Sequence, residues 1–116
     1  MAAKTFLHEG GVIVAEWTLT SGDPTGTELV IPYHTDICVT VEGTFGDATF
    51  SLEGKNHPVV ATGAWFILAD LQGNAITKTA AFVEQAQEAP FMIRPVLSTP
   101  GTTGNVTVRI KATRSR

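Results

Sequence analysis

Residues that could carry nucleophilic or metal chemistry are few in this 116-residue chain, and they are scattered along it. The three histidines are His8, His34 and His57, and the one cysteine is Cys38, which excludes an intrachain disulfide. His34 and Asp36 could share one face of a strand, but a metal site needs three or four ligands. The serines stand neither in a G-x-S-x-G turn nor beside a histidine in strand register. We therefore predict no catalytic residue, no metal and no cofactor, and we expect that the chain is not an enzyme.

Charge is unevenly distributed along the chain. Charged residues make up 16% of the sequence, against about 25% in an ordinary soluble domain. All 11 acidic residues precede position 89, whereas the basic residues beyond it are Arg94, Arg109, Lys111, Arg114 and Arg116. This distribution permits head-to-tail contacts, or docking of a basic C-terminal tail on an acidic surface; a solvated strand face with a frayed tail is the alternative. A net charge of −3 and a tail without aromatic residues disfavour nucleic acid as the partner.

No segment of the sequence is suited to cross a membrane. The longest apolar run, residues 59–69, is interrupted by Gly63 and is shorter than the roughly 20 residues that a membrane helix requires. The first residues lack the apolar stretch of a signal peptide. We therefore expect a soluble protein that is made in the cytoplasm and has no membrane partner.

Alternation of apolar and polar residues predicts that most of the chain forms strands. In residues 12–19, Ile13, Ala15, Trp17 and Leu19 share one face, as in a half-buried strand. Further strands are expected at residues 28–33, 36–42, 48–54, 59–68, 75–79, 91–97 and 105–112. Those at 36–42 and 48–54 are expected to form a hairpin.

About eight short strands separated by turn residues predict one domain over residues 1–116, an antiparallel β-sandwich or jelly roll. Residues 80–88 contain good helix formers, so they fit a helix of at most two turns, another strand or a loop. At most one short helix is therefore expected. A short N-terminal arm, residues 2–7, and the basic C-terminal tail, residues 109–116, are expected to pack loosely and to become ordered on a partner.

Four large aromatic residues could stack on a sugar, namely Trp17, Tyr33, Trp65 and Phe66. Trp17 shares the apolar face of its strand and is expected in the core. Trp65 and Phe66 are adjacent, so in a strand they point to opposite sides, and one of them is exposed or lies at a subunit interface. A carbohydrate-binding module is therefore one interpretation of the sequence.

Short motifs in a fixed order give the sequence a resemblance to a known family. They are, in chain order, GTFGDATFSLEG at 43–54, Trp65, DLQGNAIT at 70–77, IRPV at 93–96 and GTTGNVTV at 101–108. In this order they resemble small virion proteins of tailed bacteriophages, in which a turn similar to GSNDG-x-x-W precedes D-x-QGN-x-L-x-x-T, an E…RP-x-V stretch and a GDGTT loop. The likeness spans roughly residues 36–110, and the chain departs from the pattern in the loops at 55–58 and 100–102.

The resemblance implies a capsid cement (decoration) protein with a jelly-roll or β-sandwich fold. Such a protein binds the outer surface of the shell built by the major capsid protein and stabilises it. The expected location is the capsid surface of virions that are assembled in the host cytoplasm. A tail, head-fibre or adaptor component of the virion is the nearest alternative.

The resemblance carries no catalytic residue, so the site residues expected from the sequence are those of protein interfaces. Self-association as a dimer or trimer is expected from the region of Trp65 and Phe66. The full set of interface candidates is Lys4, Phe6, Trp65, Phe66, Arg94, Arg109, Lys111 and Arg114.

Overall fold

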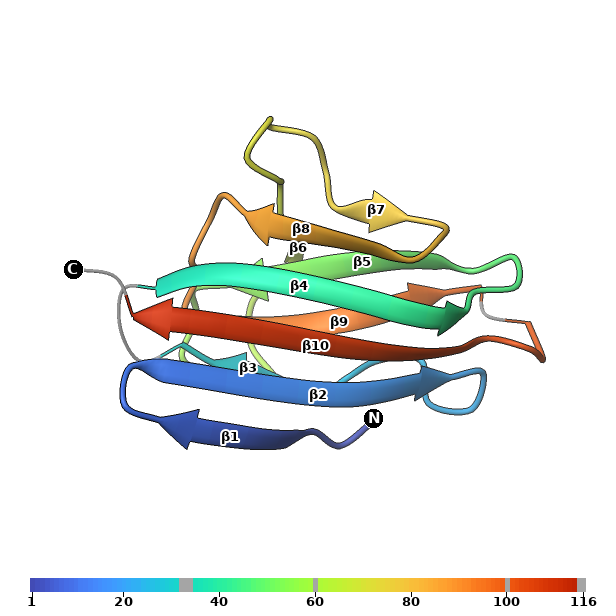
Figure 1. Ribbon diagram of the computed structural model, residues 1–116, viewed down its shortest axis with the longest axis horizontal. Helices are drawn as coiled ribbons and strands as arrows, with labels where there is room; N and C mark the ends of the chain where they lie inside the picture. The colour runs from blue at the N-terminus through green and yellow to red at the C-terminus, as the bar shows by residue number, and fades with distance from the viewer. Residues whose placement is uncertain (32–34, 60, 100, 115–116) are drawn as a thin grey trace.

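Two antiparallel sheets pack face to face in the computed structural model, which describes residues 1–31, 35–59, 61–99 and 101–114 (Figure 1). The strands of the described chain are β1 (Thr5–Glu9), β2 (Val12–Thr20), β3 (Leu29–Val30), β4 (Thr35–Thr44), β5 (Thr49–Lys55), β6 (Phe66–Ile67), β7 (Thr77–Lys78), β8 (Phe82–Ala86), β9 (Met92–Ser98) and β10 (Asn105–Arg114). The first sheet has the order β1-β2-β10-β4-β8, and the second has the order β3-β9-β5-β6, with β7 also paired to β5. The predicted all-β antiparallel sandwich is confirmed.

The strands pair as nested partners from the ends of the chain toward its middle. β2 pairs with β10, β3 with β9, β4 with β8, and β5 with β6 and β7, each time antiparallel. In the outermost pair, Val12 lies opposite Thr113 and Thr20 lies opposite Asn105. The chain is therefore folded like one long hairpin whose two arms are rolled into two sheets.

The core lies between the sheets and follows the predicted alternation. In β2, Ile13, Ala15, Trp17 and Leu19 are all buried, and the indole Nε1 of Trp17 donates a hydrogen bond to the carbonyl oxygen of Thr27 at 3.0 Å. Each fully buried aliphatic or aromatic side chain contributes about 1.5–3 kcal/mol relative to an exposed one. The other strands supply the rest of the core, including Ile37, Val39, Val41, Phe50, Leu52, Ile93, Leu97, Val106, Val108 and Ile110.

One local prediction differs from the structure, and another is decided between its alternatives. The sequence predicts a strand over 59–68, but there the described chain forms a strand at Phe66–Ile67 alone. The described residues before it, 59 and 61–65, form no strand, because the ammonium group of Lys55 binds the carbonyl oxygens of Val59 and Thr62. Within residues 80–88 the strand alternative holds, since Phe82–Ala86 pairs with β4; edge pairing outweighs helix propensity here.

The expectation of loosely packed ends is wrong for most of both segments. Ala2 is buried and exchanges backbone hydrogen bonds of 2.8 Å with Thr25 and Thr27, while the terminal amino group lies 3.0 Å from Asp23. β1 then pairs with β2 along its whole length. β10 is the central strand of the first sheet, with β2 and β4 on its two sides. The ends are held because β1 forms an edge strand of the first sheet and β10 forms its central strand; residues 115–116 lie outside the described chain.

Candidate interaction surfaces

The eight interface candidates fall in three separate places. Lys4 lies in the N-terminal segment and Phe6 in β1, although the side chain of Phe6 is outside the described structure. Arg109, Lys111 and Arg114 lie on β10, in the first sheet. The remaining three, Trp65, Phe66 and Arg94, belong to the second sheet or to the loop beside it. The interface candidates therefore do not form one surface, because the fold distributes them over three places.

Trp65 is held against two cations on the outer face of the second sheet. The guanidinium carbon of Arg94 lies 4.3 Å from the centroid of the Trp65 ring, and the ammonium nitrogen of Lys55 lies 4.8 Å from it. Arg94 also donates from Nε and Nη2 to Oε1 of Glu53, at 2.9 and 2.8 Å. Cation–π contacts of this kind attach the loop that carries the indole to the sheet.

Lys55 is a structural residue that sequence reasoning missed. Its relative exposure is 5%, and its Nζ donates hydrogen bonds to the carbonyl oxygens of Val59 at 3.2 Å and Thr62 at 2.8 Å. A buried ammonium group is tolerated where such acceptors replace its water. The sequence predicts that Lys55 lies in the turn that follows the strand at 48–54, and nothing in the sequence indicated that a loop covers it.

Phe66 and Ile67 form an exposed apolar pair in β6, at an edge of the second sheet. Their relative exposures are 68% and 48%. The prediction that one of the adjacent aromatic residues is exposed is confirmed, because Trp65 is partly buried and Phe66 is open to solvent. We name the exposed side chain of Phe66 the β6 patch.

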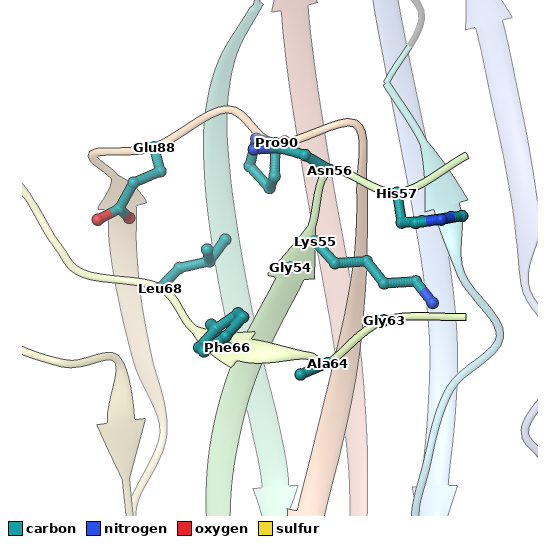
Figure 2. A pocket seen from close by; sticks show the side chains of 10 residues that line it. All are labelled: Gly54, Lys55, Asn56, His57, Gly63, Ala64, Phe66, Leu68, Glu88 and Pro90. Atoms are coloured by element: carbon teal, nitrogen blue, oxygen red, sulfur yellow. The ribbon is translucent and has the colours of Figure 1, made fainter. Parts of the chain in front are cut away.

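A groove of about 390 Å³ lies beside the β6 patch (Figure 2). Several side chains around it are already bonded to backbone groups: the Nδ1 atom of His57 accepts from the Val59 amide at 3.0 Å, and Oε1 of Glu88 accepts from the Ala69 amide at 2.8 Å. The groove thus offers mainly apolar surface to a partner. Its lining residues are Gly54, Lys55, Asn56, His57, Gly63, Ala64, Phe66, Leu68, Glu88 and Pro90.

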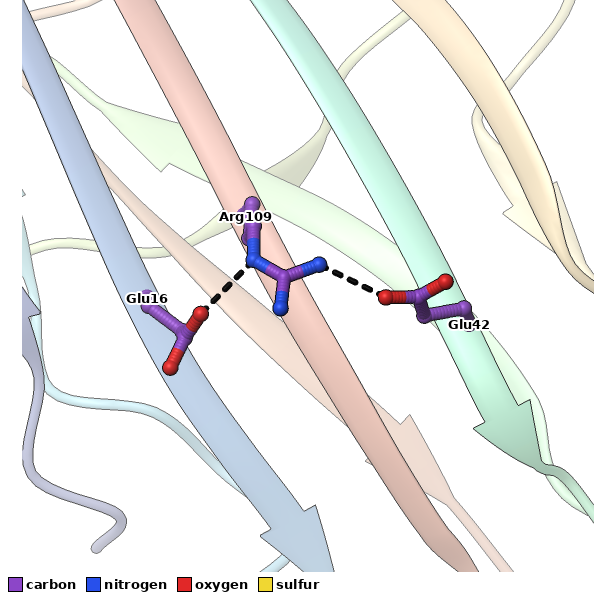
Figure 3. A network of polar contacts seen from close by, with 3 residues as sticks. All are labelled: Glu16, Glu42 and Arg109. Atoms are coloured by element: carbon purple, nitrogen blue, oxygen red, sulfur yellow. Dashed lines mark hydrogen bonds and ion pairs between the residues drawn. The ribbon is translucent and has the colours of Figure 1, made fainter.

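The predicted basic tail is partly neutralised by its neighbours in the first sheet (Figure 3). Arg109 donates from Nε to Oε2 of Glu16 at 2.7 Å and from Nη1 to Oε1 of Glu42 at 2.6 Å. The hydrogen bonds to Glu42 and then to Glu16 raise the pKa of the Arg109 guanidinium. This network places two carboxylates around one cation, so the region is not the purely basic surface that the sequence suggested.

The residues considered for catalysis do not come together in the described chain. Cys38 is partly buried on β4, where it pairs with Lys111 on one side and Gln85 on the other. His34 of the His34 and Asp36 pair lies outside the described residues. Among residues 1–31, 35–59, 61–99 and 101–114, no group of three His, Cys, Asp or Glu side chains is placed to hold a metal ion. That part of the chain also contains no helix with the length and apolar character to span a bilayer.

Comparison with known proteins gave no relative. The chain matches no protein-family model, no curated protein and no solved structure.

Proposed function

We propose that this chain is a structural protein of a tailed-bacteriophage virion, a capsid cement (decoration) protein. In this proposal it binds the outer surface of the shell formed by the major capsid protein, and it is located on virions assembled in the host cytoplasm. Self-association is part of the proposal. In this proposal the chain acts by adhesion and not by catalysis. Each bound copy stabilises the shell because it adds contacts that must break before a coat subunit can leave.

The resemblance of the ordered motifs to small phage virion proteins supports this proposal, and so does the fold. The nested pairing of β2 with β10, β3 with β9 and β4 with β8 favours the jelly-roll form of the sandwich, in which two Greek keys form two packed sheets. Jelly rolls are used repeatedly in viral capsid proteins.

The observation that carries the adhesive function is the β6 patch beside its groove. Exposed aromatic side chains next to a concave apolar surface are typical of the centres of protein interfaces. Phe66 is the most exposed large apolar side chain among the described residues. We place the contact with the coat here, within an interface of about 1,600 Å², the standard size for specific complexes.

The test uses virions produced from the genome that encodes this chain, with the gene intact or deleted. Mass spectrometry should detect the chain in the intact particles, and cryo-electron microscopy should lose density from the outer shell surface when the gene is deleted. Absence of the chain from particles would refute the proposal. Loss of density from the tail, with an unchanged shell, would assign it to the tail component instead.

Purified protein added back to the deleted particles locates the contact. Phe66→Ser should weaken shell binding at least tenfold, because truncation of a central aromatic residue costs about 2 kcal/mol. The control is Val83→Ser, which removes an apolar side chain of similar exposure, 62%, from β8 in the other sheet. Equal binding by both variants would remove the β6 patch from the interface. Binding of the free protein to a glycan array would favour the carbohydrate-binding alternative.

A further inference from the structure

The four edges of the sandwich are protected to different degrees. In the second sheet the edge strands β3, β6 and β7 have two residues each, and short edges offer few backbone groups for pairing. In the first sheet, β8 is flanked by another segment: Asp70 forms a bridge with Ala86, the Gln87 amide donates to the carbonyl oxygen of Ala69 at 2.8 Å, and Lys78 lies 3.2 Å from Glu84. These edges are therefore short or covered.

β1 is different, because it combines length with an uncovered side. It has five residues, Thr5–Glu9, and in the described chain no strand or isolated bridge lies on its side away from β2. Figure 1 shows β1 at the margin of the molecule. The strand contains neither proline nor lysine, two residue types that commonly protect an edge.

β1 is also held rigidly in an extended form. At one end, Ala2 is fixed by its hydrogen bonds to Thr25 and Thr27. At the other, Glu9 and Val12 close a two-residue turn in which Gly10 has φ +60°, the position where type II′ hairpin turns place glycine. A fixed edge strand loses little conformational entropy when another strand pairs with it.

The turn also determines which way the backbone of β1 faces. Glu9 and Val12 flank the turn and form a hydrogen-bonded pair, so the pattern alternates from there along the strand. Leu7 therefore bonds to β2, whereas intervening residues, Phe6 among them, turn their N–H and C=O groups toward the open side. A new antiparallel strand on that side would bond to those groups and would face Leu7 as a non-hydrogen-bonded pair.

We propose that the occupant of this edge is a second copy of the chain, with the two β1 strands pairing antiparallel about a two-fold axis at Leu7. This register overlaps all of Thr5–Glu9. It places Glu9 opposite Thr5 of the second copy, so no like charges meet. It also places Leu7, with 57% exposure, against Leu7 of the second copy. This contact lies in the shallow hollow that Leu7 and Val14 line together with Thr5 and Glu16. The result is one continuous sheet through both copies.

This inference goes beyond the proposed function and moves self-association from the Trp65 and Phe66 region to β1. It is tested on the purified full chain without any shell, so its outcome is independent of coat binding. In sedimentation velocity the mass should rise from one chain to two between about 1 μM and about 1 mM, the range for a small specific interface. A protein that stays monomeric throughout would overturn the inference.

Charge substitutions at Leu7 test the position of the two-fold axis. Leu7→Lys and Leu7→Glu should each weaken dimerisation at least tenfold, because like charges then face each other across the axis. An equimolar mixture of the two variants should dimerise again. The matched control is Val83→Lys, on the covered edge of the same sheet, with the same dimerisation as the parent. Dimers that persist in Leu7→Lys alone, or that Val83→Lys abolishes, would contradict this interface.

Discussion

The two outer faces of the sandwich carry charged residues in the same alternating pattern, but in different surroundings. On the first sheet, Arg109 binds Glu16 and Glu42 with its side chain 47% exposed. On the second sheet, Lys55 occupies an outward position of β5, yet it is almost fully buried under the loop that follows. Exposed ion pairs contribute little to stability, whereas a buried donor leaves costly unpaired acceptors when it is removed. We therefore expect that a charge on an outer face is structural where another segment covers it.

The largest effect is expected beneath the exposed outer face, in the core that both faces share. Val39 on β4 is fully buried, and Val39→Asp would place a carboxylate there without a partner. We expect a loss of about 4 kcal/mol or more, or failure to fold, measured by urea unfolding followed by circular dichroism. Thr40→Asp, one residue along on the outer face, is the control and should cost less than about 1 kcal/mol. Equal unfolding midpoints for Val39→Asp and the parent would show that the strand register is wrong.

Removal of the buried charge on the covered face comes second. Lys55→Met keeps much of the side-chain length but removes the donor to the carbonyl oxygens of Val59 and Thr62, so we expect a loss of about 2 kcal/mol and faster proteolysis of the loop. The matched variant is Lys111→Met on the other outer face, where Lys111 is exposed; it should change the free energy of unfolding by less than about 0.5 kcal/mol. If both lysines proved equally dispensable, the contrast between the faces would be lost.

The difference between the faces also separates what could be predicted from the sequence from what could not. The three central strands of the first sheet, β2, β10 and β4, were predictable because one face of each is buried and the other is not, which produces a period-2 alternation in their sequences. The loop over the second sheet was not predictable in this way. Its residues include the apolar run of 59–69, which has the composition of a strand, whereas the contact that prevents pairing comes from Lys55, outside the run.

The candidate site was predictable only in part, for the same reason. Adjacent aromatic residues must diverge, so exposure of one of Trp65 and Phe66 followed from sequence. Which of them is exposed depended on Arg94, which lies far along the chain and is brought to Trp65 by the pairing of β9 with β5. Likewise, the basic residues of β10 looked like a free tail because the sequence does not reveal that β10 pairs with β2 on one side and with β4 on the other.

A smaller effect should distinguish the two adjacent aromatic residues. Trp65→Ala removes the ring that lies against Lys55 and Arg94, and we expect a loss of about 1.5 kcal/mol from the lost contacts and burial. Phe66→Ala should change stability by less than about 0.5 kcal/mol, because its side chain is already exposed. Thermal unfolding of both variants measures the difference. A larger loss for Phe66→Ala would place that side chain in the packed structure and not in an interface.

The smallest effect is expected from the ion network on the exposed face, and it includes a pH dependence. Hydrogen bonds to Glu42 and Glu16 raise the pKa of Arg109 in the folded state. A base with a raised pKa adds stability that is lost only when the pH rises through that folded-state value, which for arginine is strongly alkaline. Between about pH 5 and pH 9 the charge on Arg109 is therefore constant. Arg109→Gln should change the unfolding midpoint only slightly, and by the same amount at every pH in this interval. A difference that grew toward pH 9 would mean that the guanidinium network acts on a second titrating group. The network on the exposed face would then have a structural role, as Lys55 has on the covered face.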